Sequence, residues 1–173
     1  VAAADDSFYF RPDGGQVLVI LRGQDGTGQI ALVGAADGSL RVLKVVDAWF
    51  RPLKSTFSPA GDAISYDRPA RPDSPERDVF ILGISPGPES GREIPLVRHP
   101  ANDYLLGWAP DGKALLFASD RAGAFDVWRI RVAGRQPQGA PELLKKDIGR
   151  VWPIGFTRSG SFYYAIQTGM VDV

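Results

Sequence analysis

Residues 108–132, with the sequence WAPDGKALLFASDRAGAFDVWRIRV, decide the fold of this chain. The segment starts with an aromatic residue and a Pro-Asp-Gly turn, continues with the apolar run 114–118, and ends with a second run that opens on Asp126. Proline presets φ at about −65° early in a turn, and glycine accepts the positive φ that many turns need. The segment therefore predicts two strands joined by a tight turn, with a further strand ahead of them.

Weaker copies of this segment occur before and after it. Each copy has an aromatic residue four positions ahead of a glycine: FRPDG at 10–14, FSPAG at 57–61, WAPDG at 108–112 and FTRSG at 156–160. The aromatic residues are separated by 47, 51 and 48 residues. A period of this length indicates a repeat architecture in which each copy forms one supersecondary unit.

Three further runs follow the turns at corresponding positions. The first run is almost wholly apolar, which indicates a strand that is buried on both faces. The second opens with Asp-Val in three of the four copies, and the third is more polar, as edge strands are. The expected strands are 17–21, 63–66, 114–118 and 162–166, then 29–33, 78–82, 126–132 and a start at 172–173, then 40–45, 92–97 and 141–145.

Four strands per copy, with buried inner strands and a polar outer edge, are typical of a β-propeller blade. We therefore expect an all-β fold with essentially no helix: a single partial β-propeller over residues 1–173. It should contain about three and a half four-stranded blades in an incomplete ring, at approximately 8–46, 55–97, 104–146 and 152–173. A β-sandwich is the main alternative, but it would not require a fixed offset from aromatic residue to glycine.

Residues 108–128 resemble the TolB-type propeller repeat, a relative of the Trp-Asp repeat family. That repeat has an aromatic residue, Ser-Pro-Asp-Gly, an apolar strand, Ser-Asp-Arg, and a strand that opens with an acidic and an aromatic residue. The chain matches it at 108–112, at 119–121 and at 126–128, whereas the other copies match in part. The resemblance implies a TolB-like propeller from a bacterium in a periplasmic or extracellular setting, with a cytoplasmic location still open.

Composition excludes several classes of function. Twenty Lys and Arg balance twenty Asp and Glu, so the chain lacks the basic face that nucleic-acid binding needs. There is no Cys and one His, so we expect no metal site and no cofactor. No apolar run approaches the roughly 18 residues that cross a bilayer, and we expect no membrane insertion. The first four residues, VAAA, are expected to be a linker or the remnant of a cleaved leader.

Residues 83–87, GISPG, match the Gly-x-Ser-x-Gly pattern of a serine nucleophile. In that motif the residue after the serine donates its backbone N–H to an oxyanion, and Pro86 has no N–H to donate. The segment also leaves a strand for a loop rich in Pro and Gly. We therefore expect a hairpin loop, no catalytic residues, and a protein that is not an enzyme.

Residues that recur once per copy are expected to build the blades. The recurring carboxylate, at Asp78, Asp126 and Asp172, should accept backbone N–H groups at the start of its strand. Asp120 and Arg121 should pair with each other or cap the turn between strands. The recurring aromatic residues Phe57, Trp108 and Phe156 should wedge between blades.

The loops that lead into the inner strands carry a different set of residues. Propellers place such loops at one end of the central channel, and aromatic residues with arginine are typical of binding hot spots. The candidate binding residues are Trp49, Arg51, His99, Asp103, Tyr104, Arg150 and Trp152. Tyr104 and Trp152 both lie four positions ahead of the repeat aromatic, so packing between blades is the alternative role for these two.

These residues favour a non-catalytic module that binds a protein or peptide partner through its channel-end loops. The alternative is the substrate-gating propeller of a larger prolyl-oligopeptidase-type serine peptidase, which a Gly-x-Ser-x-Gly motif in the gene beyond Val173 would support. An incomplete ring exposes two apolar blade faces. We therefore also expect self-association, or completion by missing blades.

Overall fold

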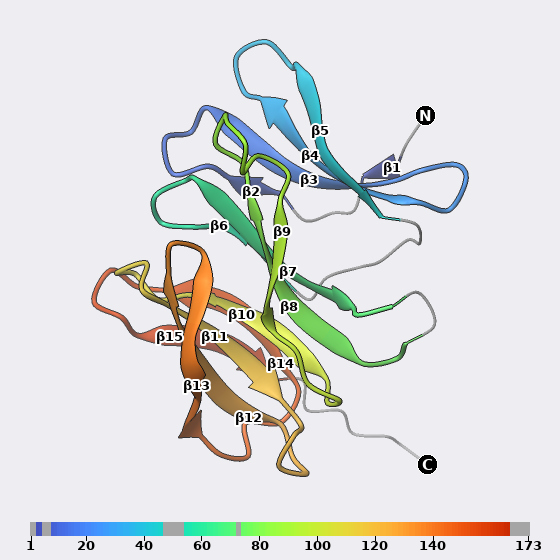
Figure 1. The fold of residues 1–173 in the computed structure, drawn as a ribbon. Helices are drawn as coiled ribbons and strands as arrows, with labels where there is room; N and C mark the ends of the chain where they lie inside the picture. The colour runs from blue at the N-terminus through green and yellow to red at the C-terminus, as the bar shows by residue number, and fades with distance from the viewer. Residues whose placement is uncertain (1–2, 5–7, 47–53, 72–73, 167–173) are drawn as a thin grey trace.

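The structure is a computed structural model that describes residues 3–4, 8–46, 54–71 and 74–166. These residues form fifteen β-strands in four antiparallel sheets, and they contain no helix. Figure 1 shows the sheets in succession along the chain, from the blue first sheet to the red hairpin at the C-terminal end. In the described ranges, therefore, no helix is present that could span a membrane.

Each sheet corresponds to one copy of the repeat. The first sheet contains β1 (Ala3–Ala4), β2 (Tyr9–Phe10), β3 (Gln16–Arg22), β4 (Gly28–Gly34) and β5 (Leu40–Val46), with β1 and β2 both paired to β3. The second contains β6 (Ser55–Phe57), β7 (Ala63–Pro69), β8 (Arg77–Gly83) and β9 (Glu93–Val97). The third contains β10 (Asp103–Trp108), β11 (Ala114–Ser119), β12 (Asp126–Ala133) and β13 (Gln136–Lys145). The fourth is the hairpin of β14 (Val151–Phe156) and β15 (Phe162–Ile166).

Two segments differ from the sequence-based expectation. Ala3 and Ala4, expected to be part of a linker, instead form β1 and pair with Arg22 and Leu21 of β3. Strand β13 starts five residues earlier than expected, because the positive φ of Gly134 and Arg135 closes a tight turn. Pairing with β12 therefore begins at once, where Ala133 faces Gln136.

The hydrophobic core consists of three clusters, each between two consecutive sheets. Phe57 lies in the cluster between the first and second sheets, and Trp108 lies in the cluster between the second and third. Phe156 packs against the cluster between the third and fourth sheets. The prediction that the repeat aromatics wedge between blades is therefore confirmed, and apolar burial between sheets stabilises their succession.

The inner strands β10 and β14 share a bulge directly before the repeat aromatic. The pairing register shifts between Leu105 and Gly107, and likewise between Pro153 and Gly155. Gly107 has φ 143° and Gly155 has φ 152°, values that favour glycine. A Cβ atom on Gly107 would make an ordinary van der Waals contact with the Phe156 ring, at 3.5 Å, so the positive φ and not the space favours glycine at this position.

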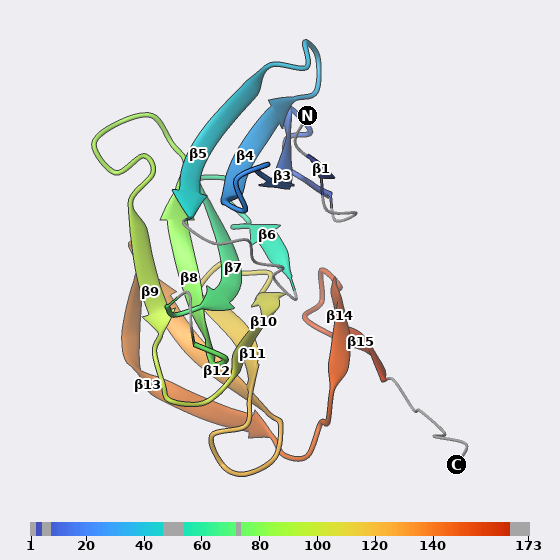
Figure 2. The same cartoon turned by 90° about the vertical axis from the view of Figure 1, so that its right-hand side faces the viewer.

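The fold is thus an all-β partial propeller with three full sheets and the first two strands of a fourth. The sheet order runs from the inner strands β2, β6, β10 and β14 outward, and among the described residues β15 forms the free edge of the fourth sheet. Figure 2 shows the hairpin β14–β15 standing beside β10 and β11, and no other sheet of the described residues lies on its far side. This arrangement creates the pocket described next.

Candidate functional site

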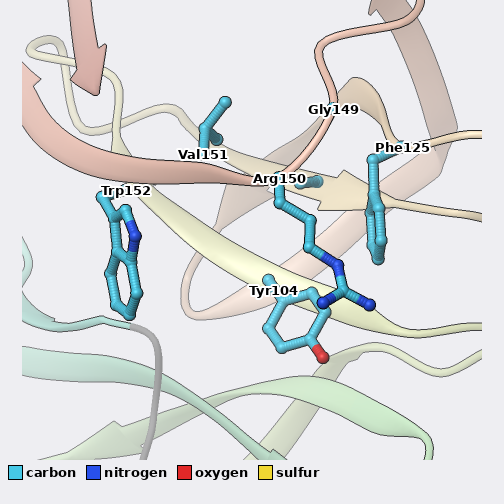
Figure 3. Close-up of a pocket in the computed structure, with 7 residues that line it drawn as sticks. Tyr104, Phe125, Gly149, Arg150, Val151 and Trp152 are labelled. Carbon is cyan, nitrogen blue, oxygen red and sulfur yellow. The ribbon is translucent and has the colours of Figure 1, made fainter. Parts of the chain in front are cut away.

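A pocket of about 280 Å³ lies where the third sheet meets the start of β14. It is lined by Tyr104, Ala118, Phe125, Gly149, Arg150, Val151 and Trp152, and we call it the Tyr104–Trp152 pocket. Figure 3 shows the Arg150 side chain extending toward Tyr104 and Phe125, with Trp152 at the opposite end. Three of the seven candidate residues predicted from the sequence, Tyr104, Arg150 and Trp152, thus meet in one pocket.

The loop that carries Arg150 is held to the start of β12. The backbone N–H of Asp147 donates to Oδ1 of Asp126 at 2.8 Å, and the N–H of Ile148 donates to the carbonyl of Phe125 at 2.8 Å. Asp147 and Gly149 have positive φ values of 54° and 70°, which turn the chain toward β14. These constraints position Arg150 and Trp152 on a rigid scaffold.

The same arrangement recurs one repeat earlier. Oδ1 of Asp78 accepts the backbone N–H of His99 at 3.2 Å, again 21 residues further along the chain. Burial raises the pKa of Asp78, although the N–H of His99 opposes the shift. The expectation that the recurring carboxylates accept backbone N–H groups is confirmed for Asp78 and Asp126, and each of these two anchors the loop that leads to the next sheet. Asp172, with the strand start expected at 172–173, lies outside the described residues.

Tyr104 stands between two residues that occupy the same repeat position. The guanidinium of Arg77 lies 5.7 Å from the centre of the Tyr104 ring, and the ring of Phe125 lies 5.8 Å from it on a tilted plane. Arg77 and Phe125 both directly precede the recurring aspartate. Tyr104 is therefore a half-buried wall of the pocket, held by a cation–π contact and an aromatic contact.

Both ends of the pocket are accessible, and the end at Arg150 is positively charged. Trp152 exposes 55% of its surface, and Arg150 is also exposed. The lining contains this one cationic side chain and no carboxylate. A guanidinium beside aromatic surfaces can bind a carboxylate through paired N–H groups while apolar groups pack on the rings.

Asp103 is placed differently from the other candidates. Its side chain is fully buried, and Oδ1 accepts a hydrogen bond from the Arg121 guanidinium at 2.8 Å. Burial raises the pKa of Asp103, although Arg121 and Ser119 oppose the shift. The expectation that Asp103 faces a partner therefore does not agree with its position, because a buried, ion-paired carboxylate offers no surface.

The neighbouring acidic residue holds the loop that leads into β10. Asp120 accepts hydrogen bonds from both the backbone N–H and the side-chain amide of Asn102, at 2.8 and 3.1 Å. Arg121 pairs with Asp103 and not with Asp120, and its guanidinium lies over the rings of Phe117 and Trp128. The contact of Asp120 with Asn102 is neither the pair with Arg121 nor the cap on the turn after β11 that the sequence suggested.

The remaining candidates lie outside the pocket. His99 is exposed on the loop before β10 and does not line the Tyr104–Trp152 pocket. Trp49 and Arg51 lie outside the described residues.

Four lining residues were not among the candidates, and Phe125 is the aromatic one; the other three are Ala118, Gly149 and Val151. The repeat position of Phe125, directly ahead of the recurring aspartate, could have identified it.

Two kinds of catalytic site can be compared with the described residues. No group of three or more His, Asp or Glu residues is positioned there to hold a metal ion. Residues 83–87 connect β8 to β9 within one antiparallel sheet, as the hairpin interpretation predicted, so Ser85 is not on a strand-to-helix turn.

Comparison with known proteins identifies the fold. No protein-family model matches the sequence, and no curated protein matches it either. Among solved structures, a TolB-type protein from Agrobacterium tumefaciens matches over 91% of this chain and 52% of its own, with 23% identity and a TM-score of 0.68. The β-propeller domain of the Trilobed protease from Pyrococcus furiosus matches over 84% and 43%, with 15% identity and a TM-score of 0.59.

A puromycin-hydrolysing peptidase from Mycobacterium tuberculosis matches over 79% of this chain and 23% of its own, with 18% identity and a TM-score of 0.60. The chain therefore spans about half the length of the TolB-type structure and about a quarter of the peptidase. At these identities the likeness shows a TolB-like β-propeller fold. The function has to be argued from the site.

Proposed function

We propose that this chain is a non-catalytic β-propeller module that binds a protein or peptide partner at the Tyr104–Trp152 pocket. The supporting observation is the convergence of an exposed tryptophan, an exposed arginine and two supported aromatic rings on one pocket of about 280 Å³. Tryptophan, tyrosine and arginine are the residue types that dominate binding energy at protein interfaces. The pocket is at the small end of ligand sites, which suits one or two side chains of a peptide.

The charge of the pocket specifies the partner further. Arg150 is the only charged residue in the lining, and Tyr104, Phe125 and Trp152 supply apolar surface. A matching peptide presents an acidic residue next to an aromatic or aliphatic one. No cofactor or metal is needed for this function, and the chain's zero net charge gives no reason to expect nucleic acid as a partner.

A display library of random peptides tests this proposal. Peptides selected on the wild-type chain should be enriched in an acidic residue beside an apolar one. Trp152→Ala should weaken their binding by about tenfold or more, which corresponds to the loss of one hot-spot side chain. Peptides selected on the Arg150→Ala variant should no longer be enriched in the acidic residue. Lys113→Ala is the matched control, because Lys113 is an exposed cation outside the lining.

The proposal fails if the selected peptides bind Trp152→Ala and Arg150→Ala as tightly as they bind the wild type. It also fails if the purified chain shows hydrolase or lyase activity that a variant of its own residues abolishes. The TolB-like fold is the basis for proposing a periplasmic or extracellular setting, which fractionation of a cell that expresses the parent gene would test.

Self-association is the second part of the partner proposal. The fourth sheet exposes Ile154, Tyr163 and Ile166, three large apolar side chains on a sheet with a free edge. A second copy of the chain, or further blades of a parent protein, would cover them. Light scattering should show dimers or larger species of the isolated chain, and Tyr163→Lys should shift them toward monomer. A monodisperse wild-type monomer contradicts this part.

The alternative role is that of a substrate-gating propeller in a larger peptidase. It is retained because the similar structures include prolyl endopeptidases and the tricorn protease, which this chain matches over 23% and 18% of their lengths. A Gly-x-Ser-x-Gly motif on a strand-to-helix turn in the downstream gene would favour it over the binding module.

A further inference from the structure

A second concave surface lies on the inner strands, separate from the Tyr104–Trp152 pocket. It encloses about 430 Å³ and is formed by residues on or next to β2, β6, β10 and β14. We call it the inner-strand groove. None of the residues that line the Tyr104–Trp152 pocket lines this groove.

The groove has apolar walls and two cations. Phe57, Trp108 and Phe156, the three repeat aromatics that wedge between sheets, all contribute to its lining. Lys54 and Arg158 are its charged residues, and the lining contains no carboxylate. A surface with two positive charges and no negative one attracts anions.

Lys54 is buried, and its side chain bonds to neutral groups of the described residues. It is only 9% exposed, and its Nζ donates to the carbonyls of Pro153 and Ile154 at 3.4 and 3.2 Å. The ring of Tyr9 lies 5.9 Å from the same nitrogen. No carboxylate pairs with Nζ among the described residues. An ammonium has three N–H donors, so two long bonds to neutral carbonyls leave it under-satisfied. Burial accordingly lowers the pKa of Lys54.

Both cations depart from the repeat. The residues four and three positions ahead of the repeat aromatic are Tyr104 and Leu105 in the third copy, and Trp152 and Pro153 in the fourth. The second copy has Lys54 three positions ahead of Phe57, where the third and fourth copies have Leu105 and Pro153. Two positions after the aromatic the first three copies have proline, and the fourth has Arg158. Neither cation belongs to the repeat pattern, and yet both line the same groove.

We propose that the inner-strand groove binds a carboxylate attached to an apolar group, with Lys54 as the anchoring cation. The carboxylate would complete the hydrogen bonds of the buried ammonium, and Arg158 at the groove's edge would add a second, exposed contact. The apolar part of the ligand would pack against the repeat aromatics. A carboxylate with an apolar body fits better than a phosphate, because one buried cation and aromatic walls suit a single charge.

The test uses 3-phenylpropanoate as the probe and its neutral amide as the chemical control. Calorimetry on the wild-type chain should detect binding of the acid and none of the amide. Lys54→Met should weaken binding about tenfold or more, since a hydrogen bond to a charged group is worth roughly 1.5–3 kcal/mol. Lys54→Arg should retain part of it, and Arg158→Ala should reduce it less. Lys113→Met controls for loss of a surface charge.

A second readout separates binding from a folding defect. In NMR spectra of the wild-type chain labelled at lysine side chains, the acid should raise the apparent pKa of Lys54, because a nearby anion favours the ammonium. Equal binding of acid and amide, or unchanged affinity in a folded Lys54→Met variant, overturns the proposal. Two further arms distinguish the source of the carboxylate. If the natural ligand is a chain terminus, a short peptide that ends in phenylalanine should bind when its C-terminus is free and should not bind when it is amidated. If 3-phenylpropanoate binds and the peptide does not, the natural ligand is a free small acid.

Discussion

Strands β11 and β15 occupy the same place in the repeat, and they are buried to different extents. All six residues of β11 are buried, whereas β15 alternates between half-buried and exposed positions. Leu116 and Tyr163 lie opposite the bulge glycines Gly107 and Gly155, and they are 8% and 58% exposed. The strands have similar apolar sequences, so the difference comes from their neighbours.

The difference arises on one face of the sheet. Leu116 and Ala118 belong to the cluster between the third and fourth sheets, and this cluster covers the face of β11 that is turned toward the fourth sheet. Phe162 and Tyr164 of β15 pack against the same cluster from the other side. Tyr163 and Ala165, on the opposite face of β15, meet no such cover and are exposed. Burial of an inner strand in this fold is therefore a property of two adjacent sheets.

The repeat aromatics give the largest expected effect. Trp108→Ala should lower the free energy of unfolding by about 3–5 kcal/mol, because the indole fills the core between two full sheets. Phe156→Ala should cost roughly half as much, since Phe156 is only partly buried against the last cluster. Urea unfolding of both variants checks this order. Equal losses would show that the fourth sheet is as well packed as the third.

The second prediction compares Leu116 with Tyr163. Leu116→Ala should cost about 2–3 kcal/mol, and Tyr163→Ala less than about 0.5 kcal/mol in the dilute monomer. The gap should narrow as protein concentration rises if a second copy covers the fourth sheet. Urea unfolding over a hundredfold range of concentration measures both quantities. A large, concentration-independent loss for Tyr163→Ala would contradict the open face.

Local patterns in the sequence predicted the strands well. The turn glycines and apolar runs located β3, β7, β11 and β15 to within a few residues, because strand signals depend on neighbours in the sequence. Burial of 162–166 on both faces was wrong, because that property depends on another sheet. The pairing register of the β14–β15 hairpin could not be predicted from the sequence either. The turn at 157–161 lacks Pro and Asp and closes with Thr157 N–H on the Ser161 carbonyl, one residue sooner than Ala109 on Ala114.

The candidate site was predicted only in part for a similar reason. Tyr104, Arg150 and Trp152 follow from their place on loops that lead into inner strands, and the structure brings them together. Asp103 has the same sequence context, but it is buried in an ion pair with Arg121. Arg121 comes after the end of β11, 18 residues further along the chain. Lys54 gave no signal as a single residue. Its importance appears only when its acceptors on β14 are known.

The third prediction replaces the buried carboxylate at the start of β10 with the apolar residue found at the start of β14. Asp103 and Val151 both start an inner strand five residues ahead of the repeat aromatic, and both are buried. Asp103→Val alone should cost roughly 2 kcal/mol, because it leaves the mostly buried guanidinium of Arg121 without its carboxylate. The double variant Asp103→Val with Arg121→Met should recover most of the loss, since apolar replacements of a buried pair are often neutral. Thermal unfolding of the three proteins measures the coupling. Additive losses would mean that the pair has no energetic link.

The smallest effect concerns the contact between the second copy and the fourth sheet. Lys54 reaches the carbonyls of β14, and burial lowers its pKa below that of an unfolded lysine, about 10.4. Between the folded and unfolded pKa values the unfolded chain binds more protons, so this group makes stability rise with pH. The Lys54→Met variant lacks that contribution. Urea unfolding at pH 7 and pH 10 should therefore show the wild type gaining stability relative to the variant at the higher pH. Contributions from other titrating groups cancel in the comparison, provided the variant leaves their environments unchanged. Identical pH dependence of the two proteins would mean that Lys54 is as well solvated in the folded chain as in the unfolded one.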